Sequence, residues 1–116
     1  MLFSQGDIVD VFFPLKQGDQ PHPALIISND NVNSLEEKYF CVMITGNLTK
    51  DEFSFFLDDK MTTKQLDKNS VIRLSLFSTF RDKEIQKKKS HLKREFLLQV
   101  LGQFNEVILQ PQEPGF

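Results

Sequence analysis

Four polar residues, His22, Thr45, Arg73 and Ser75, have side chains that can transfer a proton, donate hydrogen bonds or hold a phosphate. Imidazole has an unperturbed pKa of about 6.5, so it can act as an acid or a base near neutrality. Guanidinium is permanently charged and can hold a phosphate with two parallel hydrogen bonds. Each residue also has an ordinary structural role open to it, such as a loop-edge histidine or an arginine paired with an acidic neighbour.

The fold must bring these residues together, because they lie far apart in the sequence. His22 stands between two prolines that restrict its backbone, at the mouth of a predicted strand. Thr45 closes the next strand. Arg73 and Ser75 lie two residues apart on a later strand, so we expect their side chains on the same face. The pattern allows a cleft near the strand ends.

Five apolar or alternating segments predict β-strands, at 7–13, 23–28, 39–45, 53–57 and 70–79. Residues 29–34 predict a turn or an irregular segment. Because no helix is expected between the early strands, we predict a mainly β fold, a small antiparallel barrel or sandwich with a C-terminal amphipathic α-helix.

The period of the apolar residues changes after Asp82, which can cap a short turn through Ile85. Ser90 is a good N-cap for a longer helix. The apolar residues of that helix recur at intervals of three and four, at Leu92, Phe96, Leu97, Val100, Leu101, Phe104, Val107 and Ile108. This stripe must be buried against the sheet or against another subunit.

The composition is that of one globular domain, because 116 residues of which 40% are hydrophobic can form one modest core. We expect a domain over 1–109 and a flexible tail over 110–116. No apolar run reaches the roughly 20 residues that span a bilayer. The net charge of −2 does not indicate nucleic-acid binding, although a local basic patch is possible. A run such as 87–89, all lysine, is more often a solvated face.

Common catalytic motifs are absent: the sequence has no glycine-rich phosphate loop, no His-Glu-x-x-His and no Gly-x-Ser-x-Gly. The only histidines, His22 and His91, lie far apart, so we expect no metal site and no cofactor. The lone cysteine, Cys41, lies in an apolar run and predicts a buried free thiol. A cytoplasmic location is the default for such a chain.

Several segments resemble the MazF/PemK family of toxin endoribonucleases from type II toxin–antitoxin modules. The resemblance runs from Gly6 to about Ile108, in one consistent order. It rests on Gly6-Asp7-Ile8-Val9, on the segment 20–30 around Pro21-His22-Pro23, on Val42-Met43-Ile44-Thr45-Gly46-Asn47, and on Ser70-Val71-Ile72-Arg73-Leu74 with Thr79.

The resemblance implies a small SH3-like antiparallel barrel with a C-terminal helix, acting as a homodimer. It implies metal-independent cleavage of single-stranded RNA and a cognate antitoxin that covers the RNA groove. MazF-like members carry an arginine where this chain has His22. PemK-like members carry an arginine at the position of Arg73 and an aspartate at that of Ser75. Thr45 matches the MazF-like hydroxyl.

On this basis His22 would do acid–base work, Arg73 would hold the phosphate, Thr45 would orient the reacting groups and Ser75 would be a hydrogen-bonding neighbour. Lys16, Gln17, Asn47 and Arg81 are the residues expected to bind RNA. Two alternatives remain open. One is a non-catalytic member of the same fold that binds protein, as the gyrase poison CcdB does. The other is a degenerate module that binds RNA or antitoxin without cutting.

Overall fold

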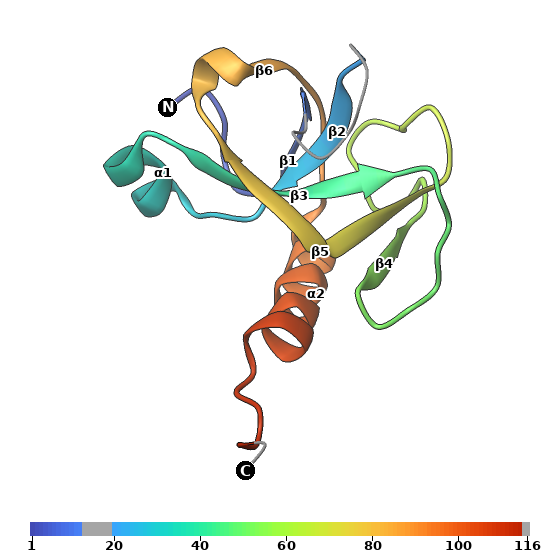
Figure 1. The fold of residues 1–116 in the computed structure, drawn as a ribbon. Coiled ribbons are helices and arrows are strands. Elements are labelled where there is room, and N and C mark those ends of the chain that lie inside the picture. The colour runs from blue at the N-terminus through green and yellow to red at the C-terminus, as the bar shows by residue number, and fades with distance from the viewer. Residues whose placement is uncertain (13–19, 115–116) are drawn as a thin grey trace.

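The computed structural model describes residues 1–12 and 20–114, which form an antiparallel sheet with helices around it (Figure 1). In chain order the elements are β1 (Asp7–Val11), β2 (His22–Ile26), α1 (Asp30–Glu36), β3 (Tyr39–Thr45), β4 (Ser54–Leu57), β5 (Ser70–Phe80), the 3₁₀ turn η1 (Asp82–Glu84), β6 (Ile85–His91), α2 (Arg94–Phe104) and the π-helical turn η2 (Asn105–Leu109). The strand order is β4-β5-β3-β2-β1-β6. No helix among the described residues is both long and apolar enough to span a membrane.

The sheet is mainly antiparallel, as predicted, but the expected closed barrel is wrong. β6 follows β5 directly after η1, yet it pairs with β1, and no ladder joins β5 to β6 in the described chain. At the other edge β4 is only four residues long. The loop after β4 reaches the end of β6 through one isolated bridge, Thr62 to Leu92. One bridge cannot pair two edge strands, so the sheet stays open.

A large bulge bends β5 near its middle (Figure 1). Met43 of β3 pairs with Arg73, whereas the adjacent Val42 pairs with Phe77. The residues between Arg73 and Phe77 therefore lie opposite no residue of β3. A bulge of this kind bends and twists the strand that carries it. The bend helps the sheet to curve, so that each of its two faces can enclose apolar side chains.

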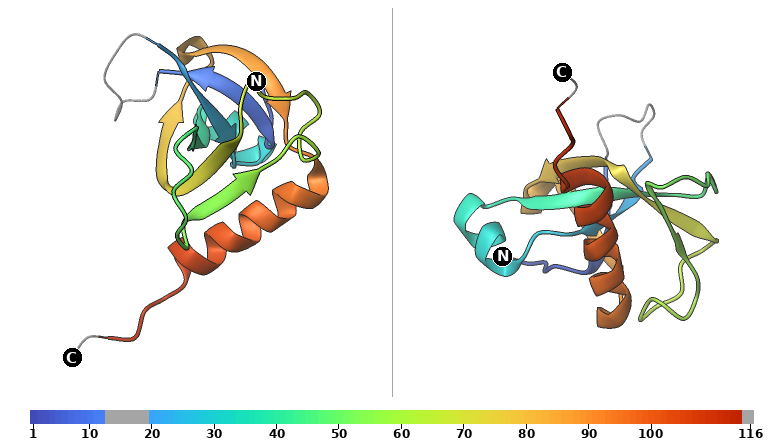
Figure 2. Two further views of the ribbon diagram at one scale, coloured as in Figure 1. Left: turned by 90° about the vertical axis from the view of Figure 1, so that its right-hand side faces the viewer. Right: turned by 90° about the horizontal axis from the view of Figure 1, so that it is seen from below.

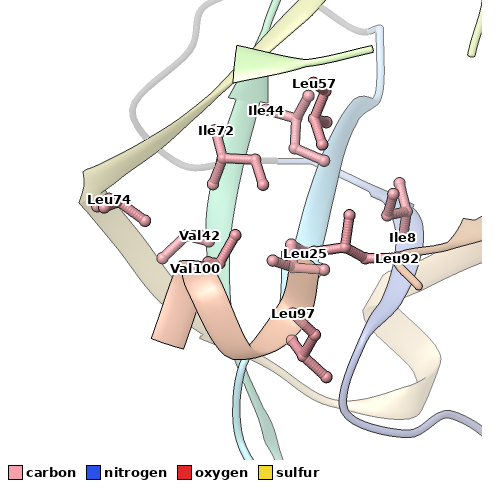
Figure 3. Close-up of a cluster of buried hydrophobic side chains, with 10 residues drawn as sticks. All are labelled: Ile8, Leu25, Val42, Ile44, Leu57, Ile72, Leu74, Leu92, Leu97 and Val100. Carbon is pink, nitrogen blue, oxygen red and sulfur yellow. The ribbon is translucent and has the colours of Figure 1, made fainter. Parts of the chain in front are cut away.

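Alternation along the strands divides the core into two clusters on opposite faces. The first contains Ile8, Leu25, Val42, Ile44, Leu57, Ile72, Leu74, Leu92, Leu97 and Val100 (Figure 3). The second contains Val9, Val11, Ala24, Ile26, Tyr39, Cys41, Met43, Phe80 and Ile85. The apolar stripe of the C-terminal segment packs on the first cluster, so α2 covers that face of the sheet, as Figure 2 shows. Burial against the sheet was one of the two expected outcomes.

Two elements differ from the sequence prediction. The segment expected to be irregular contains α1, which begins because the Asn29 side chain accepts a hydrogen bond from the Val32 N–H. Ser90 does not cap a helix but lies in β6, where its hydroxyl bonds both the N–H and the carbonyl of Lys64. The helix α2 begins only at Arg94.

The strand β6 was hidden by its polar sequence, in which lysines occupy three successive positions. It lies at one edge of the sheet, where lysine side chains can reach water. Lys88 lies 3.0 Å from the Asp7 carboxylate, and Lys89 lies 3.9 Å from that of Asp10. The lysine run is thus part of a strand whose charges pair with buried carboxylates of β1, rather than only a solvated face.

Gly6 and Asp7 join β1 to β2, β6 and the start of the C-terminal segment. The Gly6 N–H donates to the Ile26 carbonyl, and the Gly6 carbonyl accepts from the Leu92 N–H, both at 2.8 Å. The φ of Gly6 is +94°, in a region that favours glycine. The Asp7 carboxylate lies 2.8 Å from His91 Nδ1.

Burial by itself raises the pKa of the Asp7 carboxyl, because it disfavours the charged form. Hydrogen bonds with His91, with the Ser4 N–H and with Lys88 act in the opposite direction and outweigh burial. The pKa of Asp7 therefore lies below its ordinary value of 3.8. The folded state stabilises the ionised carboxylate.

We expect Gly6→Ala to lower the free energy of unfolding by about 1–3 kcal/mol, because an L-residue is strained at that φ. A Cβ there would also meet His91 Cε1 at 2.8 Å. The matched control is Gly102→Ala in α2, where a Cβ would meet nothing within 4 Å and alanine favours the helix. Denaturant unfolding of both variants checks this, and equal effects would contradict it.

We expect Asp7→Asn to destabilise the protein at neutral pH by about 1.5–3 kcal/mol, the range for hydrogen bonds to a charged group. The lowered pKa means that the stability from Asp7 is present above pH 3.8 and is lost as pH falls through the folded value. The difference between wild type and variant should therefore shrink below that pH. Urea unfolding at several pH values measures it, and a constant difference would refute this assignment.

Candidate functional site

A pocket of about 220 Å³ lies between the end of β3, the loop after it and the middle of β5. Its lining consists of Met43, Thr45, Asn47, Thr49, Arg73 and Leu76. Three of these, Thr45, Asn47 and Arg73, are residues singled out from the sequence. They come from segments about thirty positions apart, so only the pairing of β3 with β5 brings them together.

The register of β3 and β5 explains why Thr45 and Arg73 share this pocket. Arg73 pairs with Met43, and Thr45 follows Met43 by two positions on the same face of β3. Such diagonal neighbours in an antiparallel pair lie about 7–8 Å apart, within reach of a long side chain. The Thr45 hydroxyl accepts a hydrogen bond from the Asn47 N–H at 3.2 Å, which turns the chain toward the pocket rim.

Arg73 pairs with an acidic neighbour, which is the ordinary structural role that the sequence left open for it. Its Nη1 lies 2.7 Å from Asp51 Oδ1 and 2.8 Å from the Ser54 hydroxyl. The arginine side chain is 18% exposed and still lines the pocket. The Arg73 guanidinium, by its hydrogen bond, holds the pKa of the Asp51 carboxyl below its ordinary value.

His22 is the first residue of β2 and is half-buried. Ala24 of the same strand pairs with Met43 and belongs to the second core cluster. Alternation therefore puts His22 on the sheet face that carries Met43 and Thr45, one strand away. His22 is absent from the pocket lining. The structure thus brings it to the same face as the other site residues but not into the pocket itself.

The bulge interrupts the two-residue alternation of β5, because Leu74 packs in the first core cluster and Leu76 packs against the second. Ser75 is exposed and is not part of the pocket lining, whereas Leu76 is. Arg81 follows β5 at the opposite end of the β3–β5 pair from Thr45, near Lys38 and Glu84. The remaining two residues expected to bind RNA, Lys16 and Gln17, lie outside the described residues.

Sequence reasoning missed Asp51 and Ser54, which contact Arg73 directly. The sequence indicates only that Arg73 can pair with some acidic residue. Nothing in it selects Asp51 among the sixteen acidic residues. Cys41 is a buried free thiol, as predicted, and burial raises its pKa to about 12. It stays protonated near neutrality and is not a nucleophile.

The pocket combines a cation with neutral donors and an apolar floor. Arg73 can bind a phosphate, Thr45 and Asn47 can donate or accept hydrogen bonds, and Met43 and Leu76 offer apolar contact. Among the described residues no group of three or more His, Cys, Asp or Glu side chains could hold a metal ion. The arrangement is suited to an anionic ligand that also carries a flat or apolar part.

Solved structures that resemble this one include MazF toxins and an endoribonuclease. An endoribonuclease from a Mycobacterial species, in complex with its cognate antitoxin, has 11% sequence identity and a TM-score of 0.77, and the match covers 96% of this chain and 99% of that one. The toxin MazF-mt6 of Mycobacterium tuberculosis has 14% identity and a TM-score of 0.71, over 91% and 99%. MazF from Deinococcus radiodurans has 14% identity and a TM-score of 0.74, over 95% and 99%. These similarities show a shared fold.

A sequence search of curated proteins finds no match. The model of one protein family, however, matches residues 4–108 of the 116. That family is described as the PemK-like, MazF-like toxins of type II toxin–antitoxin systems. The matched residues include all strands of the sheet, α2 and the residues that line the pocket. The chain therefore belongs to the PemK-like, MazF-like toxin family of type II toxin–antitoxin systems.

Proposed function

We propose that this toxin is an endoribonuclease that cleaves single-stranded RNA through the 2′-hydroxyl and so inhibits translation and growth. The observation that carries the proposal is the meeting of the Arg73 guanidinium and the Thr45 hydroxyl in one pocket, beside the strand that begins with His22. The family match and the endoribonucleases among the structural neighbours support the same activity. Such a toxin would act in the cytoplasm, where mRNA is translated.

The reaction needs a base for the 2′-hydroxyl, stabilisation of the charge on the phosphate and a proton for the leaving oxygen, and residues of the site supply the first two. His22 takes the proton of the 2′-hydroxyl, whose oxygen attacks the adjacent phosphorus. The bond from phosphorus to the 5′-oxygen breaks, and that oxygen takes a proton from water, which leaves a 2′,3′-cyclic phosphate and a 5′-hydroxyl. Arg73 stabilises the charge on the phosphate oxygens, and Thr45 orients the attacking hydroxyl. No step requires a metal ion.

His22 lies outside the lining of the pocket, so its role requires the substrate to extend toward β2. The shared sheet face favours this path, because β5, β3 and β2 are successive neighbours in the sheet. A phosphate at Arg73 and a ribose over Thr45 would then lead the chain toward His22. We propose that the nucleobase next to that phosphate packs on Met43 and Leu76. There the Asn47 amide can form hydrogen bonds with the edge of the nucleobase.

We propose further that the protein binds a cognate antitoxin and forms a homodimer. One structural neighbour is an endoribonuclease in complex with its antitoxin, and two others contain MazE with MazF. A dimer is supported by large exposed apolar side chains on the face that α2 partly covers. Phe40 is 37% exposed and Phe77 is 51% exposed. Phe77 also packs edge-on against Phe104 of α2.

We expect the purified protein to cut a long single-stranded RNA in the presence of a chelator, with cyclic-phosphate ends. Arg73→Ala should lower kcat/KM by about 10²–10³-fold, as for loss of a donor to a developing anion. His22→Ala should lower it by about 10²–10⁴-fold, the range for one acid or base. Mass spectrometry of the fragment ends and single-turnover kinetics measure these effects.

Arg94→Ala is the control, because Arg94 is an exposed cation on α2 far in the sequence from the pocket residues. It should cut at the wild-type rate. Undiminished cleavage by both Arg73→Ala and His22→Ala would refute the assignment of the site. Intact RNA across many sequences would refute the activity and favour a toxin that binds its target without cutting.

A further inference from the structure

The loop that joins β3 to β4 and the first residue of β4 hold the Arg73 guanidinium by one of its three nitrogen atoms. Nη1 donates to Asp51 Oδ1 at 2.7 Å and to the Ser54 hydroxyl at 2.8 Å. Nη1 carries two hydrogens, so these two bonds occupy that nitrogen fully. The guanidinium still has three donor hydrogens, two on Nη2 and one on Nε, and the Nε hydrogen and one Nη2 hydrogen lie side by side on another edge. That edge is the kind of fork that grips a phosphate with two hydrogen bonds.

Asp51 is itself held in place by the loop. Its Oδ1 accepts from the Phe53 N–H at 2.9 Å and lies 3.1 Å from the Ser54 hydroxyl. The Ser54 N–H donates to the Asp51 carbonyl at 3.2 Å, which closes a tight turn. The Ser54 hydroxyl also lies 2.7 Å from the Thr49 carbonyl, and Thr49 lines the pocket.

The same loop is tied to the C-terminal helix. The Gln103 side-chain amide on α2 donates to the carbonyl of Glu52 at 2.9 Å and to that of Ser54 at 3.2 Å. A chain of hydrogen bonds thus runs from α2 through the loop to Nη1 of Arg73. The guanidinium is therefore held in place by its own strand, β5, and also by α2, which packs on one face of the sheet.

We propose that Asp51 is a positioning residue that fixes the Arg73 guanidinium, so that its Nε–Nη2 edge faces the phosphate in the pocket. This rests on the proposed RNA cleavage. Asp51 acts through Arg73, because its oxygen meets the nitrogen on the edge that the phosphate does not use. A flexible arginine would still attract the phosphate, but it would hold it in many orientations, of which few suit in-line attack.

Two observations favour positioning over other roles of Asp51. The Arg73 guanidinium keeps the pKa of the Asp51 carboxyl low, so the carboxylate is ionised near neutrality and accepts a proton poorly. Its side chain is 38% exposed, and ion pairs so open to water contribute little to stability. The pair is therefore better placed to orient a functional side chain than to hold the fold together.

The test compares Asp51→Asn with Glu52→Gln, which removes a charge from the next residue. Glu52 contacts α2 through its backbone carbonyl, so its side chain serves as the control. We expect Asp51→Asn to lower kcat for RNA cleavage by about 10²-fold, the cost of a misplaced catalytic group. KM should stay constant or fall, because a negative charge near the substrate is lost. Glu52→Gln should keep the wild-type kcat, and both variants should unfold as the wild type does.

Two further variants in the same assay test the geometry. Asp51→Glu keeps the carboxylate and should recover part of the lost rate. Adding Ser75→Asp to Asp51→Asn puts a carboxylate two residues beyond Arg73 but within the bulge, and it should recover none. A kcat for Asp51→Asn within about twofold of wild type would overturn the proposal. An equal loss in Glu52→Gln, or full recovery by Ser75→Asp, would also overturn it.

A second readout separates this inference from the proposed function. In ¹⁵N spectra of arginine side chains, the Arg73 Nε signal should be distinct in the wild type and should move toward the free-arginine position in Asp51→Asn. If the wild type cuts no RNA, the proposed function fails, and this spectrum alone decides whether Asp51 orients Arg73. An Arg73 signal that is the same in both proteins would refute the positioning role.

Discussion

The bulge in β5 is the constraint on which the rest of this structure depends. Three residues, from Leu74 to Leu76, have no partner on β3, and the pairing resumes beyond them with Phe77. Before the bulge β5 lies between β3 and β4, and after it β5 pairs, among the described strands, with β3 alone. The bend at the bulge helps one sheet to form two apolar clusters, one under α2 and one on the opposite face. The same interruption brings Leu76 into the pocket with Arg73 and leaves Ser75 in water.

Several acidic and basic side chains form local ion pairs. Asp7 and Asp10 are buried carboxylates of β1, and lysines of the neighbouring edge strand lie beside them. Two of the three lysines at 87–89 are therefore paired with carboxylates, in a sequence whose net charge is −2. The cation relevant to the pocket is Arg73, and Asp51 compensates part of its charge. Binding of an anion at this site must depend on geometry more than on long-range attraction.

The candidate site differs from both arrangements that the family resemblance implies. A histidine stands where MazF-like members have an arginine, and a serine stands where PemK-like members have an aspartate. The structure offers a carboxylate to Arg73 from a different element, the loop between β3 and β4. Arg73 thus has a carboxylate partner on a neighbouring loop, which is possible because a guanidinium can donate to partners in several directions.

The sequence was sufficient to predict the β class, the boundaries of five strands to within about two residues, the apolar stripe of the C-terminal helix and the buried thiol of Cys41. These features depend on local apolar periodicity, which the chain carries whatever its partners are. It also selected Thr45 and Arg73, because alternation puts each at a definable place on its strand.

Contacts between distant segments account for the strand β6, the bulge, the open edge of the sheet and the pairing of Arg73 with Asp51. β6 has no apolar alternation of its own, and it is a strand because β1 offers it hydrogen bonds and two carboxylates. The bulge likewise exists only between two strands, so residues 74–76 carry no local mark of it. Contacts between segments far apart in sequence depend on register and packing, and neither is encoded in the composition of any single segment.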